Sequence, residues 1–317
     1  MKKILLVKTS SMGDVIHNLP VASDIGSMIG DAEIHWLVEE SLAAIPKMHP
    51  EVKRVITVAM RRWRTTLWQP RTRMEIRAFV HELREHVYDA VIDTQGLLKS
   101  AVLAWMAKGM RCGLDWASAR EPLALFYDRT YSIPWTMHAV ERNRMLAAQA
   151  LNYALPATID YGIRASKQEF AWLPPVRYAV LLHATSADRK LWDEANWLDV
   201  GRYLSERGIS SVLPWGNTDE RDRSEKLAAR ITGAIVPPAL EVDAAGALLT
   251  GAYAVVGVDT GLTHFAAALG TPTVGVYRAT DPGATGLYGS RRAVNVGSVG
   301  KPPKSRDVIA AVERLTT

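Results

Sequence analysis

The sequence predicts a two-domain α/β protein, each half of which is a doubly wound parallel sheet covered by helices. Short apolar runs alternate with segments of helical periodicity, which is the pattern of βαβ units. This plan begins twice, at Ile4–Val7 and again at Tyr178–Leu182. The chain of 317 residues is also long for one domain. We expect two Rossmann-like domains facing each other across a cleft, over residues 1–165 and 176–300, with a C-terminal helix in 301–317 that packs back toward the first domain.

Composition places the chain among ordinary globular proteins, with 48% hydrophobic and 22% charged residues. The single cysteine, Cys112, has no partner for an internal disulfide, and no Cys/His cluster has zinc-like spacing. Both facts are typical of a reducing compartment. Lys2 and Lys3 precede too short an apolar run for a signal peptide, and no run approaches the ~20 residues of a membrane span. We therefore expect a cytoplasmic protein.

Elements of the first half follow from its apolar runs and its helical periods. The predicted strands are Ile4–Val7, Ile34–Val38, Val55–Val58 and Ala90–Ile92, and the predicted helices are Val15–Ile25, Arg73–Val87, Leu97–Ala107 and His138–Leu151. Four buried runs separated by helices favour a parallel sheet, because the strands of such sheets are covered on both faces.

The first loop, Lys8–Asp14, leaves the carboxyl end of the first predicted strand, where open α/β sheets bind their ligands. Gly13 leaves room for a ligand, and Asp14 adds a carboxylate at the helix entrance. The alternative is that Ser10, Ser11 and Asp14 only cap the helix, as these residue types often do. A second polar loop follows the strand ending near Asp93 and contains Gln95 and Gly96.

A basic segment lies between Lys53 and Arg77, where eight Lys and Arg side chains accompany one acid, Glu75. Such a patch attracts phosphates of nucleic acids, membranes or substrates. Trp63 and Trp68 stand among these arginines, a mixture suited to a lipid headgroup interface. A solvated basic face with buried tryptophans explains the same pattern.

The second half repeats the strand and helix plan. Its predicted strands are Tyr178–Leu182, Ser211–Leu213, Ala234–Val236, Ala254–Val258 and Val274–Tyr277, and its predicted helices are Trp192–Arg207, one ending at Arg230, Glu241–Thr250, Phe265–Leu269 and Ser305–Leu315.

An anion site is predicted where Asp259-Thr260-Gly261 joins a buried strand to a helix, because free backbone N–H groups and the helix dipole favour a phosphate there. Thr260 and His264 add side-chain donors. The alternative is that Asp259 or Thr260 caps the helix and His264 packs on its first turn.

Two further strand-end loops of this half carry polar side chains. Thr185, Ser186 and Lys190 supply hydroxyls and an ammonium suited to a departing diphosphate, although Lys190 is equally an ordinary exposed lysine. Glu220 follows another strand and suits ribose hydroxyls, or else a solvated helix start.

The sequence lacks the signature motifs of several other classes of protein. No Gly-x-Gly-x-x-Gly follows a strand, no P-loop Gly-Lys-Ser/Thr is present, and no Asp-x-Asp pair occurs to hold a metal–diphosphate. A sugar-nucleotide epimerase or hydrolase fits the two-domain plan but does not need the arginine–tryptophan segment. A non-enzymatic phosphate or nucleic-acid binder explains the basic segment but not the strand-end loops.

Several segments together resemble the ADP-heptose:lipopolysaccharide heptosyltransferases. They are, in chain order, Lys8–Asp14, Arg61–Arg64, Ala90–Leu97, Asp115–Trp116 with Ala119–Leu123, His138–Arg142, Leu213–Gly216 and Asp259–His264. The resemblance implies a GT-B fold that binds the acceptor on the first domain and the nucleotide sugar on the second. It also implies an inverting transfer of heptose from ADP-heptose to Kdo2-lipid A, without metal or another cofactor.

Residue roles follow from the resemblance at matching positions. Asp14 would be the general base, with Lys190 assisting departure of the diphosphate. The nucleotide sugar would be bound by Thr185, Ser186, Lys190, Glu220, Asp259, Thr260, Gly261, Leu262 and His264. The acceptor would be bound by Ser10, Gly13, Arg61, Arg62, Arg64, Gln95, Arg120 and His138, the arginines receiving its carboxylates and phosphates.

The resemblance also bears on where the protein is located, and one loop departs from the family's sequence. The resemblance implies an enzyme on the cytoplasmic face of the inner membrane, held to its anionic surface by the Arg/Trp segment and not binding nucleic acid. The family's Tyr-Gly-Pro-Thr-Asp-Pro loop appears here as Tyr277–Pro282, with Arg278 and Ala279 in place of Gly-Pro.

Overall fold

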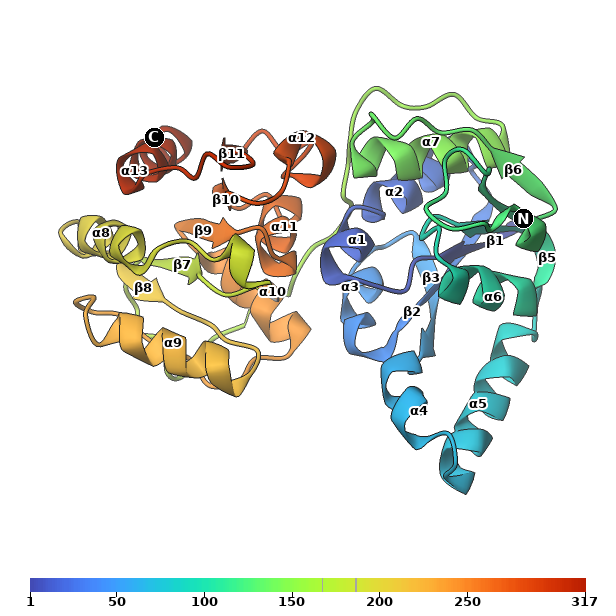
Figure 1. Cartoon of the computed structure of the whole chain (residues 1–317), viewed down its shortest axis with the longest axis horizontal. Helices are drawn as coiled ribbons and strands as arrows, with labels where there is room; N and C mark the ends of the chain where they lie inside the picture. Colours follow the sequence, from blue (N-terminus) through green and yellow to red (C-terminus); the bar gives the residue numbers. More distant parts are fainter. Residues whose placement is uncertain (167, 186) are drawn as a thin grey trace. The chain divides into compact units, whose positions relative to one another are not determined.

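The computed structural model describes every residue of the chain except 167 and 186. The chain divides into two compact units, Met1–Ile163 and Arg164–Thr317, each with its own parallel sheet (Figure 1). The boundary lies two residues before the predicted limit of 165, and the segment 164–175 belongs to the second unit. The two doubly wound α/β domains predicted from the sequence are therefore confirmed.

Unit 1 contains six strands whose order in the sheet is β3-β2-β1-β4-β5-β6, all pairing in parallel. Its elements are β1 (Lys2–Val7), α1 (Met12–Ile16), α2 (Leu19–Met28), β2 (Ala32–Glu39), η1 (Glu40–Leu42), α3 (Ala44–Lys47), β3 (Val52–Val58), α4 (Met60–Thr66), α5 (Pro70–Leu83), β4 (Val87–Asp93), α6 (Leu98–Met106), β5 (Lys108–Leu114), η2 (Ala124–Phe126), β6 (Arg129–Tyr131) and α7 (Ala139–Leu151). This order places the reversal point between β1 and β4, where such sheets bind ligands at their carboxyl ends.

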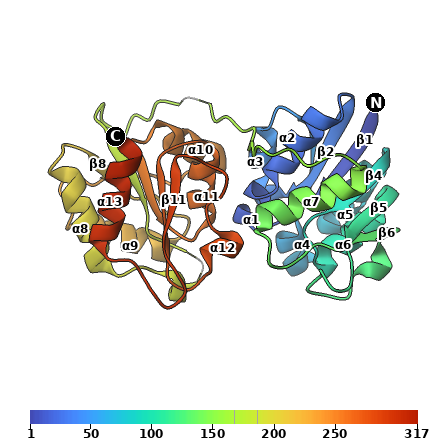
Figure 2. The ribbon, with the colours of Figure 1, turned by 90° about the horizontal axis from the view of Figure 1, so that it is seen from above.

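Helices cover both faces of the first sheet. Leu5 and Val7 point to the face where α4, α5 and α6 contribute to a common core, and the opposite face is covered by α2 and α7 (Figure 2). Arg144 of α7 is buried and its guanidinium forms two hydrogen bonds with Asp24 of α2, at 2.8 and 3.1 Å. Its Nη2 also donates to the carbonyl oxygens of Pro156 and Thr158, so one side chain fixes two helices and the chain that leaves the unit.

Unit 2 contains five parallel strands in the order β11-β10-β9-β7-β8. Its elements are β7 (Tyr178–Leu182), η3 (Asp188–Lys190), α8 (Glu194–Ser205), β8 (Ser210–Val212), α9 (Thr218–Ala228), α10 (Val242–Gly251), β9 (Ala254–Val258), α11 (Gly261–Ala268), β10 (Thr273–Tyr277), α12 (Pro282–Thr285), β11 (Ala293–Gly297) and α13 (Ser305–Thr316). The order reverses between β7 and β9, as in the flavodoxin-like arrangement.

The C-terminal helix α13 belongs to the second unit and packs into its core. Its buried residues Val308, Ala311 and Val312 join the core formed by α8 and the strands β9 and β10. The indole N–H of Trp192 donates to the carbonyl of Pro303, 2.9 Å away, and fixes the segment that leads into the helix. The amphipathic face of α13 is thus used within its own unit.

Three local predictions were wrong for physical reasons. The helix predicted over Arg73–Val87 ends at Leu83, because Val87 begins β4 and pairs with β5. The strand predicted over Ala234–Val236 is reduced to one bridge between Ile235 and Val212, since the prolines that follow have no N–H to extend a ladder. Strands β5, β6 and β11 were not predicted, because Gly and polar residues interrupt their apolar pattern.

Candidate active site

The loop after β1 ends on the short helix α1, whose entrance carries Asp14. The Oδ2 atom of Asp14 accepts hydrogen bonds from the backbone N–H and the hydroxyl of Ser11, both at 2.9 Å. The capping interpretation is therefore correct as a description of these contacts. They occupy one carboxylate oxygen, and among the described residues Oδ1 has no hydrogen-bond partner. Asp14 is thus a half-buried carboxylate with one oxygen available to a ligand.

Gln95 joins this loop to the end of β4. Its side-chain oxygen accepts the backbone N–H groups of Thr9 and Ser10, at 3.0 and 3.1 Å. The ammonium of Lys99 donates to the Ser10 hydroxyl at 2.7 Å. Gly96 has a φ of +66°, a conformation that other residues adopt only with strain, so it allows the turn that points Gln95 toward the first loop. The structure therefore brings Ser10 and Gln95, two of the predicted acceptor contacts, together on the loop that leads to Asp14.

Lys8 is a buried cation at this strand end that the sequence analysis did not single out. Only 4% of its surface is exposed, and its Nζ donates to the Thr94 carbonyl at 2.6 Å and to Asn143 Oδ1 at 3.3 Å. Burial lowers the pKa of Lys8 to about 8, although the nearby carboxylates of Asp14 and Asp93 oppose the shift. The side chain places a positive charge beneath the loop that carries Asp14.

Asp93, at the end of β4, is a buried carboxylate with four partners. It accepts from the hydroxyls of Tyr127 and Ser100, both at 2.8 Å, and from the backbone N–H groups of Gln95 and Gly96. Burial raises its pKa, and these hydrogen bonds work in the opposite direction. Because all of its contacts are internal, Asp93 organises the turn and is not placed to bind a ligand.

In unit 1, the guanidinium groups of two arginines lie near the ring of Trp135. The guanidinium carbon of Arg142 lies 3.5 Å from the ring centroid, and that of Arg120 lies 5.1 Å away. Neither has a carboxylate partner within the part of the chain that the structure describes. Burial lowers the pKa of Arg142 to about 10, and the charge of Arg120 adds to this effect. Arg120 was predicted as an anion-binding residue, whereas Arg142 was given no role.

His138 forms the N-cap of α7 and is buried. Its Nδ1 accepts the backbone N–H of Val140 at 3.2 Å, and its ring lies edge-on to that of His17 with a centroid distance of 5.4 Å. Its observed contacts are therefore those of a helix cap.

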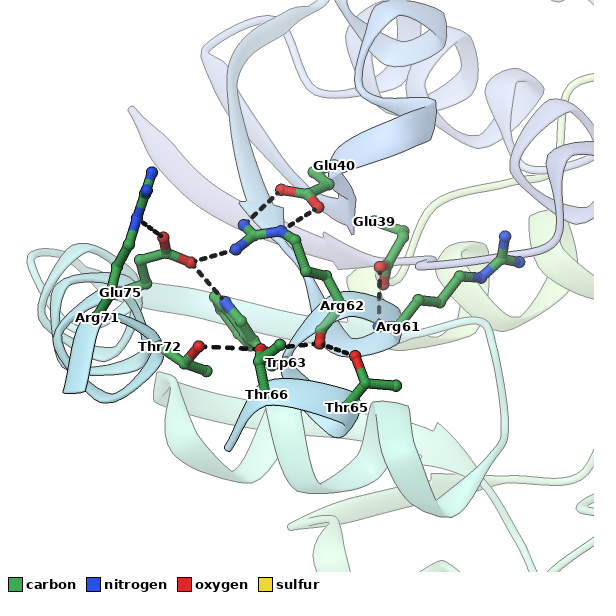
Figure 3. Close-up of polar contacts among 10 residues, drawn as sticks. All are labelled: Glu39, Glu40, Arg61, Arg62, Trp63, Thr65, Thr66, Arg71, Thr72 and Glu75. Atoms are coloured by element: carbon green, nitrogen blue, oxygen red, sulfur yellow. Dashed lines mark hydrogen bonds and ion pairs between the residues drawn. The ribbon is translucent and has the colours of Figure 1, made fainter. Parts of the chain in front are cut away.

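The arginines of α4 differ in their partners (Figure 3). Arg62 forms a bidentate pair with Glu40, with both distances 3.0 Å, and a second ion pair with Glu75 at 2.6 Å. These carboxylates raise its pKa above the usual arginine value. Arg61 points away from this cluster, and its side chain has no acidic partner in the described chain. Arg62, which was predicted to bind the acceptor, is thus already paired with two carboxylates.

Glu75, the one acid of the basic segment, fixes α5 to α4. Besides Arg62, it accepts the indole N–H of Trp63 at 3.0 Å and pairs with Arg71 at 3.2 Å (Figure 3). Trp63 itself is buried against Phe79, at a ring distance of 5.6 Å. The second tryptophan, Trp68, remains 87% exposed between the two helices. Of the two tryptophans, one is therefore core and the other is available to a partner.

Unit 2 gathers its polar groups around Asp259, at the end of β9. Its Oδ2 accepts from the Lys190 ammonium and the Thr280 hydroxyl, both at 2.7 Å, and Oδ1 lies 3.2 Å from His264 Nε2. Burial alone would raise the pKa of this carboxyl, but these donors hold it well below its usual range. Asp259 is therefore an ionised centre that organises three neighbouring segments.

The N-terminus of α11 lies next to Asp259. Thr260 is the N-cap residue and makes no side-chain capping bond, so the helix starts at Gly261 and Leu262 with the free N–H groups of a first turn. Gly257 lets this turn approach β9, because a Cβ there would lie 2.1 Å from the Thr263 hydroxyl oxygen. Thr185 donates to the Asp259 carbonyl at 3.3 Å. Ser186 lies outside the described residues.

Glu220 is placed apart from this cluster, on the first turn of α9. Its Oε2 accepts the backbone N–H of Gly216 at 2.8 Å, and its own N–H donates to the capping side chain of Asn217 at 3.0 Å. These are the contacts of a glutamate at the start of a helix, which was the alternative to a ribose-binding role.

Arg278, the departure from the family loop, connects the two segments that hold Asp259. Its guanidinium donates to the carbonyl of Leu191, directly after Lys190, and lies 3.6 Å from Asp193. Thr280, two residues further along, bonds Asp259 from the other side. Only its unusual position in the family motif singled out Arg278, and no sequence pattern predicts its partner.

The described residues contain neither a cluster of potential metal ligands nor a helix that could cross a membrane. No group of three or more His, Cys, Asp or Glu side chains there is arranged to hold a metal ion. No helix in that part of the chain has the length and hydrophobicity to span a bilayer.

Comparisons with protein families and with curated proteins both match most of the chain to heptosyltransferases. Residues 76–310 match the family described as glycosyltransferase family 9 (heptosyltransferase). A protein named lipopolysaccharide heptosyltransferase 1 from Pseudomonas aeruginosa is 49% identical over 300 residues, which cover 93% of this chain and 84% of that protein. The protein of the same name from Escherichia coli K12 is 45% identical, with 92% of each chain covered.

Solved structures agree with this result. The structure described as E. coli heptosyltransferase WaaC with ADP has a TM-score of 0.90 at 40% sequence identity and covers 99% of each chain. WaaC with ADP-2-deoxy-2-fluoro heptose has a TM-score of 0.86. E. coli heptosyltransferase II, at 19% identity, has a TM-score of 0.80 and so shares the fold. The predicted GT-B-like pair of parallel-sheet domains is confirmed.

Proposed function

Because the chain belongs to glycosyltransferase family 9, the heptosyltransferases, we propose that it performs the reaction of lipopolysaccharide heptosyltransferase I. The enzyme transfers heptose in the synthesis of the lipopolysaccharide core. In the proposed reaction the donor is ADP-L-glycero-D-manno-heptose and the acceptor is Kdo2-lipid A. The observation that supports this most is the separation of chemistry between the units: a carboxylate on unit 1 and a diphosphate-type site on unit 2.

Asp14 is the proposed general base of an inverting displacement. The acceptor oxygen attacks the anomeric carbon and gives its proton to the carboxylate, while the bond to the β-phosphate oxygen breaks and ADP leaves with that electron pair. The two hydrogen bonds from Ser11 fix Oδ2 and orient the carboxylate, and in this proposal Oδ1 accepts the proton. A positioned base of this kind contributes ~10²–10⁴-fold to the rate.

The diphosphate is proposed to bind at the start of α11. The backbone N–H groups of Gly261 and Leu262, with Thr260 and His264, favour an anion there. Lys190 pairs with Asp259, so it stands within reach of a phosphate beside that carboxylate. Charge building on the leaving diphosphate is then stabilised by Lys190 and the N–H groups, and we propose that no metal or other cofactor is required.

Other donor and acceptor contacts complete the proposal. Thr185 and Ser186 bind the diphosphate, and Glu220 accepts from the ribose hydroxyls through the carboxylate oxygen that Gly216 does not use. Ser10, Gly13, Gln95 and His138 line the acceptor side. The anionic groups of the acceptor are received by Arg61, Arg64 and Arg120, which lack acidic partners among the described residues, since guanidinium groups bind carboxylates and phosphates in bidentate fashion.

The basic segment is proposed to hold the enzyme on the cytoplasmic face of the inner membrane. Arg64, Arg73 and Arg77 are exposed on α4 and α5 beside the exposed side chains of Trp68 and Met74. Cations attract anionic headgroups, and an exposed indole is suited to the boundary between headgroups and acyl chains. Nucleic acid is not a partner in this proposal.

Incubation of the purified enzyme with ADP-heptose and Kdo2-lipid A, followed by mass spectrometry of the lipid, tests the proposed function. We expect one added heptose on the acceptor and release of ADP. Release of free heptose without change in the lipid would contradict the proposal and indicate a hydrolase, and conversion of the sugar nucleotide to an isomer would indicate an epimerase. Matched incubations without acceptor measure both side reactions.

A further inference from the structure

Helix α6 of unit 1 is apolar on two opposite sides. Ala101, Leu103 and Ala104 face inward, where they contact η2 and the core beneath α4 and α5. The spacing i, i+4, i+7 places Leu98, Val102 and Trp105 together on the other side. Their exposed fractions are 51%, 39% and 59%. We call these three residues the α6 outer face.

The α6 outer face has no equivalent in unit 2. Of the fourteen large apolar side chains that are exposed in the described chain, twelve belong to unit 1, and only Val176 and Val299 belong to unit 2. Helix α9 of unit 2, Thr218–Ala228, instead presents mainly charged residues to solvent. A contiguous apolar side on a surface helix departs from the usual pattern, in which the solvent side is polar, and indicates a binding partner.

Two cations that pair with no acid in the described chain lie next to the α6 outer face, together with one carboxylate. Lys99 is on the same helix, and Arg120 adjoins Glu121, whose carboxylate accepts the backbone N–H of Leu98. Helix α4, which carries Arg61 and Arg64, shares one core with α6 and lies on the same side of the sheet (Figure 2). The tip of η2, which packs on α6, adds the 85% exposed side chain of Leu125.

An apolar strip bordered by cations is complementary to an anionic lipid surface, because the strip enters the acyl boundary while the cations pair with headgroup phosphates. We propose that the α6 outer face inserts into an anionic bilayer and presents unit 1 to its lipid-borne acceptor. This inference rests on the proposed function and adds to it an element outside the basic α4–α5 segment. The occupant is a lipid bilayer, not a second copy of the chain.

Co-sedimentation with vesicles of phosphatidylethanolamine and phosphatidylglycerol tests the proposal. The triple variant Leu98→Ser, Val102→Ser, Trp105→Ser should bind these vesicles at least ~10-fold more weakly than the parent enzyme, because three partly inserted apolar side chains are lost. This loss should persist at high salt, since burial of apolar groups is not screened as ion pairs are. The matched control, Val176→Ser with Val299→Ser, removes exposed apolar groups from unit 2 and should bind as the parent does.

Activity on two acceptors separates this inference from the proposed function. The triple variant should keep parental turnover on a deacylated, water-soluble acceptor and lose about ten-fold in kcat/KM on the vesicle-borne lipid. A parent enzyme inactive on both acceptors would contradict the proposed function. A triple variant with unchanged vesicle binding, or with vesicle binding no weaker than that of the unit 2 control, would overturn the inference.

Folding and self-association provide the remaining readouts. The three positions are on the surface, so the thermal midpoint of the variant should remain close to that of the parent. Light scattering over a range of concentrations tests for a dimer. If the parent dimerises, the triple variant is monomeric and vesicle binding is the same for both, the α6 outer face is an interface between copies and the proposal is wrong.

Discussion

The two units gather different polar groups at the same edge of the same kind of sheet. In both, the polar loops follow the two strands that flank the reversal point, β1 and β4 in unit 1 and β7 and β9 in unit 2. Unit 1 places a carboxylate, Asp14, where two donors orient it. Unit 2 surrounds its carboxylate, Asp259, with Lys190, Thr280 and His264. Topology thus fixes where the polar loops gather, and the side chains there distinguish the proposed proton acceptor of unit 1 from the proposed anion site of unit 2.

Replacement of Asp14 by Asn tests the unit 1 half of the comparison and carries the largest expected effect. Turnover should fall by ~10²–10⁴-fold, because the amide cannot accept the proton, whereas its oxygen still accepts the capping bonds from Ser11. Steady-state kinetics with ADP-heptose and the lipid acceptor measure the loss. Ser11→Ala is the matched control: it removes one capping bond, leaves the carboxylate in place, and should lower stability by about 1 kcal/mol with a much smaller loss of turnover.

Replacement of Lys190 by Gln tests the unit 2 half. We expect a loss of ~10²–10³-fold in turnover, the usual effect of removing one donor that stabilises developing negative charge. Single-turnover kinetics with saturating acceptor measure the chemical step. Lys226→Gln, on the exposed side of α9, makes the same change of charge away from the cluster and should have no effect. Equal losses in the two variants would show that net charge, and not the position of Lys190, matters.

Replacement of Asp259 by Asn should lower the free energy of unfolding by about 1–3 kcal/mol at neutral pH, because Lys190 and His264 lose their charged partner. The pKa of Asp259 in the folded chain lies below the 3.8 of an unperturbed aspartate. Its contribution is therefore fully present above pH 3.8 and is lost as the pH falls through the lower, folded value. Urea unfolding measures the free energy of unfolding of the parent and of the variant from pH 7 downward. The difference between the two free energies should decrease only below about pH 4. A constant difference at all pH values would refute the ion-pair assignment.

The smallest expected effect separates two adjacent arginines of α4. Arg61→Ala should raise the KM for the acceptor about five-fold at low salt, whereas Arg62→Ala should leave that KM nearly unchanged, because Glu40 and Glu75 already occupy its guanidinium. Hydrogen exchange should show the opposite order: loss of Arg62 frees α4 from α5 and speeds amide exchange there. Equal KM effects of the two variants would contradict the distinction.

Much of this organisation could be predicted from the sequence because parallel strands are read as short apolar runs, and the loops at their carboxyl ends must meet at one edge. That argument predicted ligand-binding loops at these strand ends, and the structure brings Gln95 against the loop of Ser10 and Lys190 against Asp259. It also predicted the alternative at Asp14, since the same residue caps α1.

The features that were missed depend on contacts between residues far apart in the chain. Lys8 reaches the carbonyl of Thr94, 86 residues away, and Arg278 reaches Leu191, 87 residues away. The sequence around Lys8 and around Arg278 contains no pattern that predicts the partner of either residue. The pairing of Arg62 with Glu40 requires α4 to begin beside the end of β2, which local periodicity does not specify. The outer face of α6 was missed for a different reason, because helical periodicity over Leu97–Ala107 does not show which apolar residues the rest of the fold covers.

ADP binding by the Asp14→Asn enzyme, measured by calorimetry beside its transfer rate, tests the central claim that the units divide the reaction between them. The account predicts an ADP affinity equal to that of the parent and a transfer rate reduced by ~10²–10⁴-fold. Parental transfer by this variant, or a matching loss of ADP affinity, would contradict it.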